Sequence, residues 1–230
     1  LGFASARGLV DAGARVVVCG RSRERVDAAV ARLGGGAIGV ECDVSTQGGA
    51  AMFVEMAAQR LGGIDILVAN GGGPKPGNFA SLTVDDYLPA LQQSLLSVVA
   101  MCEAAVPAMR ERKWGRVVAI TSISVRQPIA NLMLSNTARA GVTGFLKTLA
   151  REIAADGVTV NSVQPGIHAT DRITQLYGAA PDAGQLGIPA GVVGDPSDFG
   201  KVVAFLCGEP ARFITGAHVP VDGGSYAGLL

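Results

Sequence analysis

The chain has 230 residues, of which 49% are apolar and 32 are glycine, and its 19 basic residues balance its 19 acidic residues. This length suits one α/β domain with a sizeable core, because such domains often exceed the usual domain size. A neutral chain without a basic run gives no support for a nucleic acid or an anionic membrane as partner. We therefore expect a small-molecule ligand.

The cysteines lie far apart in the sequence, each in an apolar segment. This pattern is typical of buried free thiols in a reducing compartment. We therefore expect a soluble, cytoplasmic protein. The four residues are Cys19, Cys42, Cys102 and Cys207.

The histidine and hydropathy patterns argue against a metalloprotein and against a membrane-spanning protein. The two histidines, His168 and His218, are isolated, so the sequence predicts no metal site. The most apolar stretch, 95–109, contains Glu103 and Pro107 and is shorter than the roughly 20 residues that a membrane span requires.

Strand and helix patterns alternate along the chain after an initial helical segment that ends near residues 11–13. A β-branched run at 15–19 lies between Gly13 and Gly20 and precedes a helix-compatible segment at 22–33. Strands separated by helix-length segments argue for a parallel sheet with helices on both faces. Further strands are predicted at 37–41, 65–69, 117–121, 158–163 and 218–221, and further helices at 46–61, 83–111 (two stretches), 131–155 and 196–207.

No linker, repeat or low-complexity tract interrupts this alternation. Residues 1–230 are therefore predicted to form a single domain. Its fold class is α/β, a Rossmann-like doubly wound parallel sheet in three layers.

One spacing in the second half of the chain identifies a family. Ser122 follows an apolar strand, Ser135 and Arg139 come later, and the segment 140–150 follows. This arrangement resembles the short-chain dehydrogenase/reductase family, in which a catalytic Ser precedes a Tyr-x-x-x-Lys motif. Here that motif has become Ser-x-x-x-Arg. Residues four apart share a helix face, so Ser135 and Arg139 can still point together at the cofactor cleft.

The resemblance implies catalytic roles for Ser122, Ser135 and Arg139, with Arg139 also able to bond the cofactor ribose. In the family, hydride passes between the nicotinamide and a carbon that bears oxygen, while Tyr moves a proton. A serine hydroxyl is a much poorer acid than a phenol, whose pKa is about 10. Arginine is a poor proton shuttle because its pKa exceeds about 12. A further departure is Ser94, which stands where many members carry an Asn that supports the proton relay.

The cofactor preference is read from the tip of the strand at 15–19. Gly20 leaves room there and Arg21 supplies charge, with Arg23 as a second candidate cation. A guanidinium binds a 2′-phosphate, whereas an acidic residue would bind the free ribose hydroxyl. We therefore expect NADP(H) rather than NAD(H). The alternative is that Arg21 is a solvated loop residue.

Other cofactor contacts are implied by the resemblance at the ends of the remaining strands. The Asp-Val pair at 43–44 is similar to an adenine-binding pair, and the Asn-Gly run that begins at 70 lets the backbone approach the cofactor. The segment 161–170 is similar to the family's V-x-P-G-x-x-x-T, which meets the nicotinamide. The implied residues are Asp43, Val44, Asn70, Gly71, Pro165, Gly166 and Thr170.

The start of the chain lacks the pattern of the family's first strand. In a doubly wound sheet that strand is central and supplies the glycine turn under the pyrophosphate. We expect an upstream strand and turn that precede Leu1. Gly2 is then the last glycine of the turn, where the helix N-terminus approaches phosphate.

The segment 171–190 corresponds to the family's variable substrate lid. Its apolar residues indicate either an apolar ligand face or loop anchors, and Tyr177 is a candidate substitute acid, although lid tyrosines more often pack. The residues are Leu176, Tyr177, Leu186 and Ile188.

A homo-oligomer, dimer or tetramer, is implied by resemblance, since relatives pair through helices that correspond here to 88–112 and 131–155. The first helix has more apolar residues than one sheet-facing stripe requires, which suggests a second buried face. The residues are Val98, Met101, Cys102, Ala105 and Met109.

Three functions fit the sequence. The first is an NADP(H)-dependent oxidoreductase acting on a carbonyl or alcohol of a small, largely apolar substrate, in which Ser122, Arg139 and either Ser135 or a bound water polarise the substrate oxygen. The second is an isomerase, lyase or cyclase on the same scaffold. The third is a catalytically silent cofactor-binding or assembly protein, because a fold alone does not establish activity.

Overall fold

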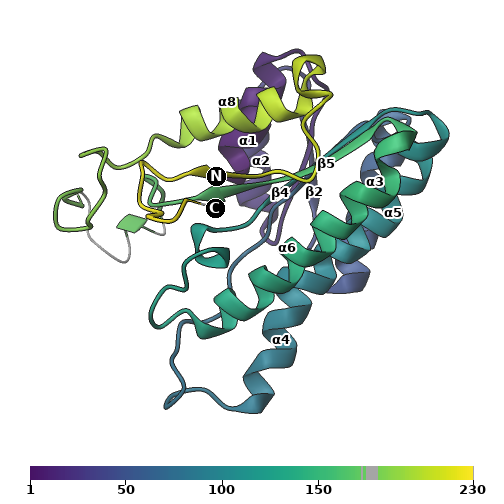
Figure 1. Cartoon of the computed structure of the whole chain (residues 1–230). Coiled ribbons are helices and arrows are strands. Elements are labelled where there is room, and N and C mark those ends of the chain that lie inside the picture. Colours follow the sequence, from purple (N-terminus) through teal and green to yellow (C-terminus); the bar gives the residue numbers. More distant parts are fainter. Residues whose placement is uncertain (172, 175–180, 230) are drawn as a thin grey trace.

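A computed structural model describes residues 1–171, 173–174 and 181–229 of the chain. It shows a parallel sheet with helices on both faces, which confirms the predicted α/β class (Figure 1). The strands are β1 (Val17–Gly20), β2 (Ile38–Glu41), β3 (Ile66–Ala69), β4 (Gly115–Ile120), β5 (Val158–Pro165) and β6 (His218–Val221). The helices are α1 (Gly2–Asp11), α2 (Arg23–Leu33), α3 (Gln47–Leu61), α4 (Tyr87–Leu91), α5 (Ser97–Glu111), α6 (Met133–Ile153) and α8 (Pro196–Cys207).

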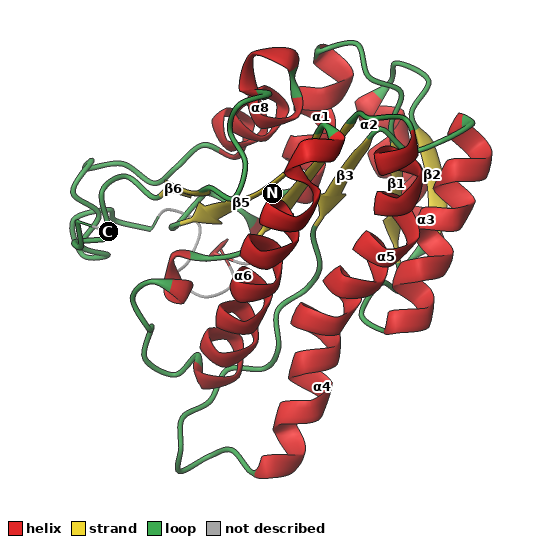
Figure 2. Ribbon diagram, turned by 45° about the vertical axis from the view of Figure 1, so that its right-hand side comes forward, coloured by secondary structure: helices red, strands yellow, loops and turns green. Residues whose placement is uncertain are grey.

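The sheet consists of two parts. Among the described residues, strand β1 pairs only with β2, while β3, β4, β5 and β6 form a continuous ladder in that order. Between the facing edges of β1 and β3 lies a cavity of about 640 Å³, with side chains of α1 and α3 in its walls. Figure 2 shows β1 and β2 beside one another and apart from the longer ladder.

Two apolar clusters hold the layers together. Helices α3, α5 and α6 cover one face of the sheet, and helices α1 and α8 cover the other. Helices α1 and α8 cross closely at glycines, since a Cβ on Gly8 would lie 2.6 Å from the carbonyl oxygen of Gly200. A larger residue at either position would force the two helices apart.

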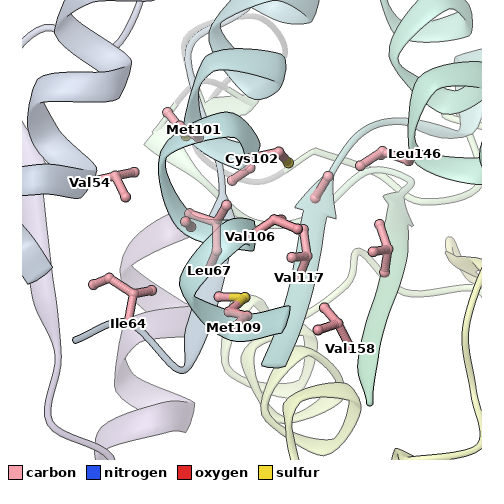
Figure 3. Packing of buried hydrophobic residues seen from close by; sticks show 14 of the residues in the cluster. Val54, Ile64, Leu67, Met101, Cys102, Val106, Met109, Val117, Leu146 and Val158 are labelled. Carbon is pink, nitrogen blue, oxygen red and sulfur yellow. The ribbon is translucent and has the colours of Figure 1, made fainter. Parts of the chain in front are cut away.

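Four of the five apolar residues of α5 that suggested a second face lie in the core of the chain itself, and the fifth, Val98, packs against that core. Met101, Cys102, Ala105 and Met109 are at most 3% exposed and belong to the core of the chain itself. Figure 3 shows how α5 directs Met101, Cys102 and Met109 into the core that contains Leu67 and Val117. Because α5 packs against α3 as well as the sheet, it buries more than one stripe. The expected oligomer therefore needs other support.

One helical run among the described residues, Val84–Glu111, has the length and hydropathy of a membrane span. It combines α4, a π-helical turn (Gln92–Leu96) and α5. Nearly half of its most apolar window is buried in the fold. Its burial against α3 and the sheet is that of a core helix.

The predicted elements are found with small shifts at their ends. Helix α6 begins at Met133 rather than 131, because Asn131 has a left-handed φ of 59° and Leu132 is not helical. Strand β5 continues beyond 163 to Pro165, since its last residues pair with β6.

The cysteines form no disulfide in the structure. Cys42, Cys102 and Cys207 are buried and Cys19 is partly buried. Burial raises the pKa of the Cys19 and Cys207 thiols to about 12, which keeps both protonated and unreactive at neutral pH.

Candidate active site

The carboxyl ends of the parallel strands meet at one edge of the sheet. This edge gathers most of the residues singled out in the sequence: Arg21 follows β1, Asp43 follows β2, Asn70 follows β3, Ser122 follows β4 and Gly166 follows β5. In open α/β sheets ligands bind outside this edge. The edge is therefore the candidate site.

The N-terminus of α1 lies beside the end of β3. A Cβ on Gly2 would lie 2.5 Å from Nδ2 of Asn70, so a larger residue here would require the Asn70 side chain to move. Leu1 at the N-cap offers no side-chain hydrogen bond to the first turn. Free amides at a helix N-terminus attract anionic groups such as phosphate.

The β1–β2 end of the edge carries charges that face solvent. Arg21 is exposed, and Ser22 next to it caps α2 by accepting a bond from the Arg25 amide at 3.3 Å. Arg23, the second candidate cation, is instead paired with Asp27 at 2.9 Å on the same helix. Arg21 is thus the better placed of the two for a phosphate.

The positive charge of Arg21 acts on the Asp43 carboxylate. Its carboxylate accepts a hydrogen bond from the Ser45 amide at 2.9 Å, and this bond is the main reason that the pKa of Asp43 lies below its usual value. Arg21 lowers the pKa further. Val44 beside it is partly buried against the core, so the pair offers one charged and one apolar contact.

Ser135 and Arg139 meet on one face of α6, as their spacing predicted. Arg139 Nε donates to Ser135 Oγ at 3.2 Å, and Arg139 Nη1 donates to the carbonyl oxygens of Ile120 and Thr121 at 3.1 and 3.0 Å. The guanidinium therefore joins α6 to the end of β4. A lysine has no planar fork for these directions.

Ser122 comes directly after the anchored end of β4. Its hydroxyl oxygen caps a single 3₁₀ turn, Ile123–Val125, by accepting the Ser124 amide at 3.1 Å. The hydroxyl proton remains for a bond to another group. The structure thus brings Ser122 to Ser135 and Arg139 through Thr121 rather than by a direct contact in the described hydrogen bonds.

Ser94 lies behind this centre, in the π-helical turn. Its side chain is 7% exposed, and its Oγ has no hydrogen-bond partner in the described part of the chain. Together with Asn70, Thr121 and Arg139 it lines a cavity of about 20 Å³. A single water needs roughly this volume.

The end of β5 forms the opposite wall of the site. The Gly166 amide donates to the Val221 carbonyl at 2.9 Å, which fixes the turn after Pro165. Thr170 begins a helical turn, since its carbonyl accepts the amides of Ile173 and Thr174.

His168, which the sequence analysis left without a role, is a structural part of this wall. It is 4% exposed and packs edge-on against Phe199. Burial lowers the pKa of His168, so the ring is neutral at pH 7. The backbone of His168 forms an isolated parallel β-bridge with Gly194 at the base of the predicted lid.

Part of the lid lies outside the described residues, including Leu176 and Tyr177. Ile188 is 5% exposed and contacts Gly223 of the C-terminal tail. This contact favours the loop-anchor interpretation of Ile188. Among the described residues, no group of three His, Cys, Asp or Glu side chains could hold a metal ion.

A parallel sheet with a helix N-terminus and glycine turns at one carboxyl edge is the arrangement of dinucleotide-binding α/β proteins. The family model described as Enoyl-(Acyl carrier protein) reductase matches residues 1–226. Dehydrogenase/reductase SDR family member 4 of Sus scrofa is 34% identical over 235 residues, which cover 100% of this chain and 84% of that protein. The chain belongs to the short-chain dehydrogenase/reductase family of oxidoreductases.

Two further proteins are similar over almost the whole chain. The 3-oxoacyl-[acyl-carrier-protein] reductase FabG of Haemophilus influenzae is 34% identical over 227 residues, covering 98% of this chain and 93% of its own length. A solved NADPH-bound short-chain oxidoreductase from Pseudomonas aeruginosa, described as containing an atypical catalytic center, has a TM-score of 0.91 and 29% identity. It covers 99% of this chain and 93% of the other.

Proposed function

We propose that this chain is an NADP(H)-dependent oxidoreductase that acts on the carbonyl or alcohol of a small, largely apolar substrate. One observation carries the proposal. The Arg139 guanidinium holds Ser135 Oγ and the last carbonyls of β4 together, directly before Ser122. Two hydroxyls and a cation are thus organised at one place, where the family motif has a tyrosine and a lysine.

The residues at the edge fit a dinucleotide. Gly2 lies close to the Asn70 side chain, and the first turn of α1 has no side-chain cap, so its amides can bind a pyrophosphate. Arg21 would hold a 2′-phosphate, and Asp43 and Val44 the adenine. Bound NADPH supplies a hydride to the substrate carbon.

The chain's own residues then handle the charge that develops on the substrate oxygen. Ser122 and Ser135 direct their hydroxyl protons toward that oxygen, and Arg139 stabilises the resulting negative charge through Ser135. Such donors act most strongly when they are fixed in advance, which the bonds to Ile120 and Thr121 accomplish. The alkoxide takes its final proton from solvent, because neither a serine nor an arginine is an adequate acid.

A homo-oligomer also remains a proposal. Exposed apolar side chains on and before α4, Phe79, Val84 and Leu88, are 61–85% exposed and extend the helix run through which relatives pair. A single monomer peak in sedimentation velocity at micromolar concentration would contradict it.

The first experiment is a titration of NADPH and NADH by fluorescence, followed by a screen of carbonyl substrates. Selective binding of NADPH with its oxidation by a carbonyl substrate supports the proposal. Binding without turnover favours the catalytically silent alternative, and conversion of a substrate without net cofactor oxidation favours an isomerase, lyase or cyclase. If the chain binds neither NADPH nor NADH, every proposed function that depends on a nicotinamide cofactor is contradicted.

A further inference from the structure

Arg126 stands at the end of the turn that presents Ser122. Ser122 begins this 3₁₀ turn as its N-cap, and the Arg126 amide closes it by donating to the Ile123 carbonyl at 3.0 Å. A short turn held by its own bonds alone is a weak element. The position of the Ser122 hydroxyl therefore depends on what anchors Arg126.

The Arg126 guanidinium is anchored on two strands at once. Its Nε donates to Gln164 Oε1 of β5 and its Nη2 to the His218 carbonyl of β6, both at 2.9 Å. Gln164 is 0% exposed, so its side chain has little freedom to move. The loop after β4 is thus fastened across its neighbouring strands.

The same guanidinium reaches the C-terminal tail. Its central carbon lies 5.3 Å from the centre of the Tyr226 ring, within cation–π range. The Tyr226 amide donates to Asp222 Oδ2 at 2.8 Å, and the backbone of Asp222 packs directly on Gly166. Arg126 therefore connects the Ser122 turn with the turn that follows Pro165.

Charge pairing does not explain these contacts. In the part of the chain that the structure describes, Arg126 forms none of the salt bridges with a carboxylate. Its hydrogen-bond acceptors are a neutral amide and a backbone carbonyl. The planar fork with two fixed directions matters here, and a lysine cannot reproduce it.

We propose that Arg126 is a positioning residue for the reaction: it sets the Ser122 hydroxyl against the Gly166 turn by clamping Gln164, the His218 carbonyl and the Tyr226 ring. This role rests on the proposed function, because it assigns Ser122 and Gly166 to opposite sides of one reacting centre. Arg126 itself touches none of the reacting atoms.

The test compares R126K with R112K. Arg112 is a matched control, since it also donates to a backbone carbonyl, that of Ile64, but at the opposite edge of the sheet. We expect R126K to lower kcat about tenfold with the NADPH dissociation constant within about twofold, because misplaced catalytic groups reduce the rate without weakening remote binding. R112K leaves kcat unchanged.

Q164L removes one acceptor of the clamp and should lower kcat similarly, while R126K/Q164L should be no worse than either single variant. The milder variant Y226L, which removes only the ring contact, should lower kcat about twofold by the weaker cation–π interaction. Additive losses in the double variant, or equal effects of R126K and R112K, overturn the proposal.

Hydrogen exchange separates this proposal from the proposed function. R126K should speed exchange of the amides in 122–127 and 222–229, and R112K should not. If the wild-type chain reduces no carbonyl substrate, the proposed function fails while this exchange pattern still supports the clamp. Unchanged exchange in both segments contradicts the clamp even in an active enzyme.

Discussion

The two parts of the sheet differ in how firmly they hold their candidate residues. In the β3–β6 part, Arg139 and Arg126 are fastened to backbone carbonyls, and the serines lie beside them. In the β1–β2 part, Arg21 and Asp43 face solvent, and a large cavity separates them from β3. The difference teaches that the candidate residues after β4 are positioned by side-chain bonds to backbone carbonyls, whereas Arg21 and Asp43 are exposed at the surface.

The largest loss of activity is expected when the hydroxyl of Ser122, in the β3–β6 part of the sheet, is removed. Ser122→Ala should lower kcat about a hundredfold to a thousandfold, because it removes a donor to the developing oxyanion, while NADPH affinity stays unchanged. Stopped-flow and steady-state assays check both. Ser124→Ala serves as control, because the buried Ser124 hydroxyl has no hydrogen-bond partner among the residues that the structure describes. A smaller loss in Ser122→Ala than in the control would end the catalytic assignment.

Substitutions of Arg139 test whether catalysis depends on the fixed hydrogen bonds of its guanidinium or on its charge alone. Arg139→Met keeps the length of the side chain but removes the bonds to Ser135, Ile120 and Thr121, and should cost about 2 kcal/mol of transition-state stabilisation, roughly thirtyfold in kcat/KM. Arg139→Lys retains charge and should recover only part of the rate. Full activity in Arg139→Lys would show that a positive charge alone suffices for catalysis. The fixed hydrogen bonds of the β3–β6 part would then not explain its role in the reaction.

The loosely held part should respond in binding rather than in turnover. Arg21→Ala should weaken NADPH binding about tenfold to a hundredfold, because charge-assisted bonds to a phosphate contribute roughly 1.5–3 kcal/mol. NADH binding should not change. Arg23→Ala is the matched control, since Arg23 is already paired with Asp27. Equal losses for both nucleotides would mean that Arg21 supports the loop and does not select the cofactor.

The smallest effect concerns how the free energy of unfolding depends on pH through His168, which lies in the wall opposite Ser122. Burial lowers the pKa of His168 in the folded state, so protonation favours unfolding. Its stabilising contribution is complete above the unfolded pKa, about 6.5, and is lost as the pH falls toward the lowered folded pKa. His168→Leu should therefore flatten the fall in free energy of unfolding below about pH 6.5, measured by urea titration. An unchanged slope would exclude His168 as the source.

Much of the fold followed from the sequence, because strands and helices have different hydrophobic periods. The parallel sheet, its six strands and the edge that carries Arg21, Asn70 and Ser122 could be predicted from alternating runs and glycine turns. The pairing of Ser135 with Arg139 followed from helical spacing alone. These are local properties of the chain.

Tertiary structure decided what local patterns could not. Met101 and Met109 are core residues because α5 packs against both α3 and the sheet, and no periodicity in α5 itself reveals its second neighbour. Arg126 drew no attention in the sequence, since Gln164 and His218 lie far along the chain and only the adjacency of β4, β5 and β6 brings them within hydrogen-bond distance. Sequence thus determined the elements and the local motifs, while contacts between distant segments determined which side chains hold the turn that begins at Ser122.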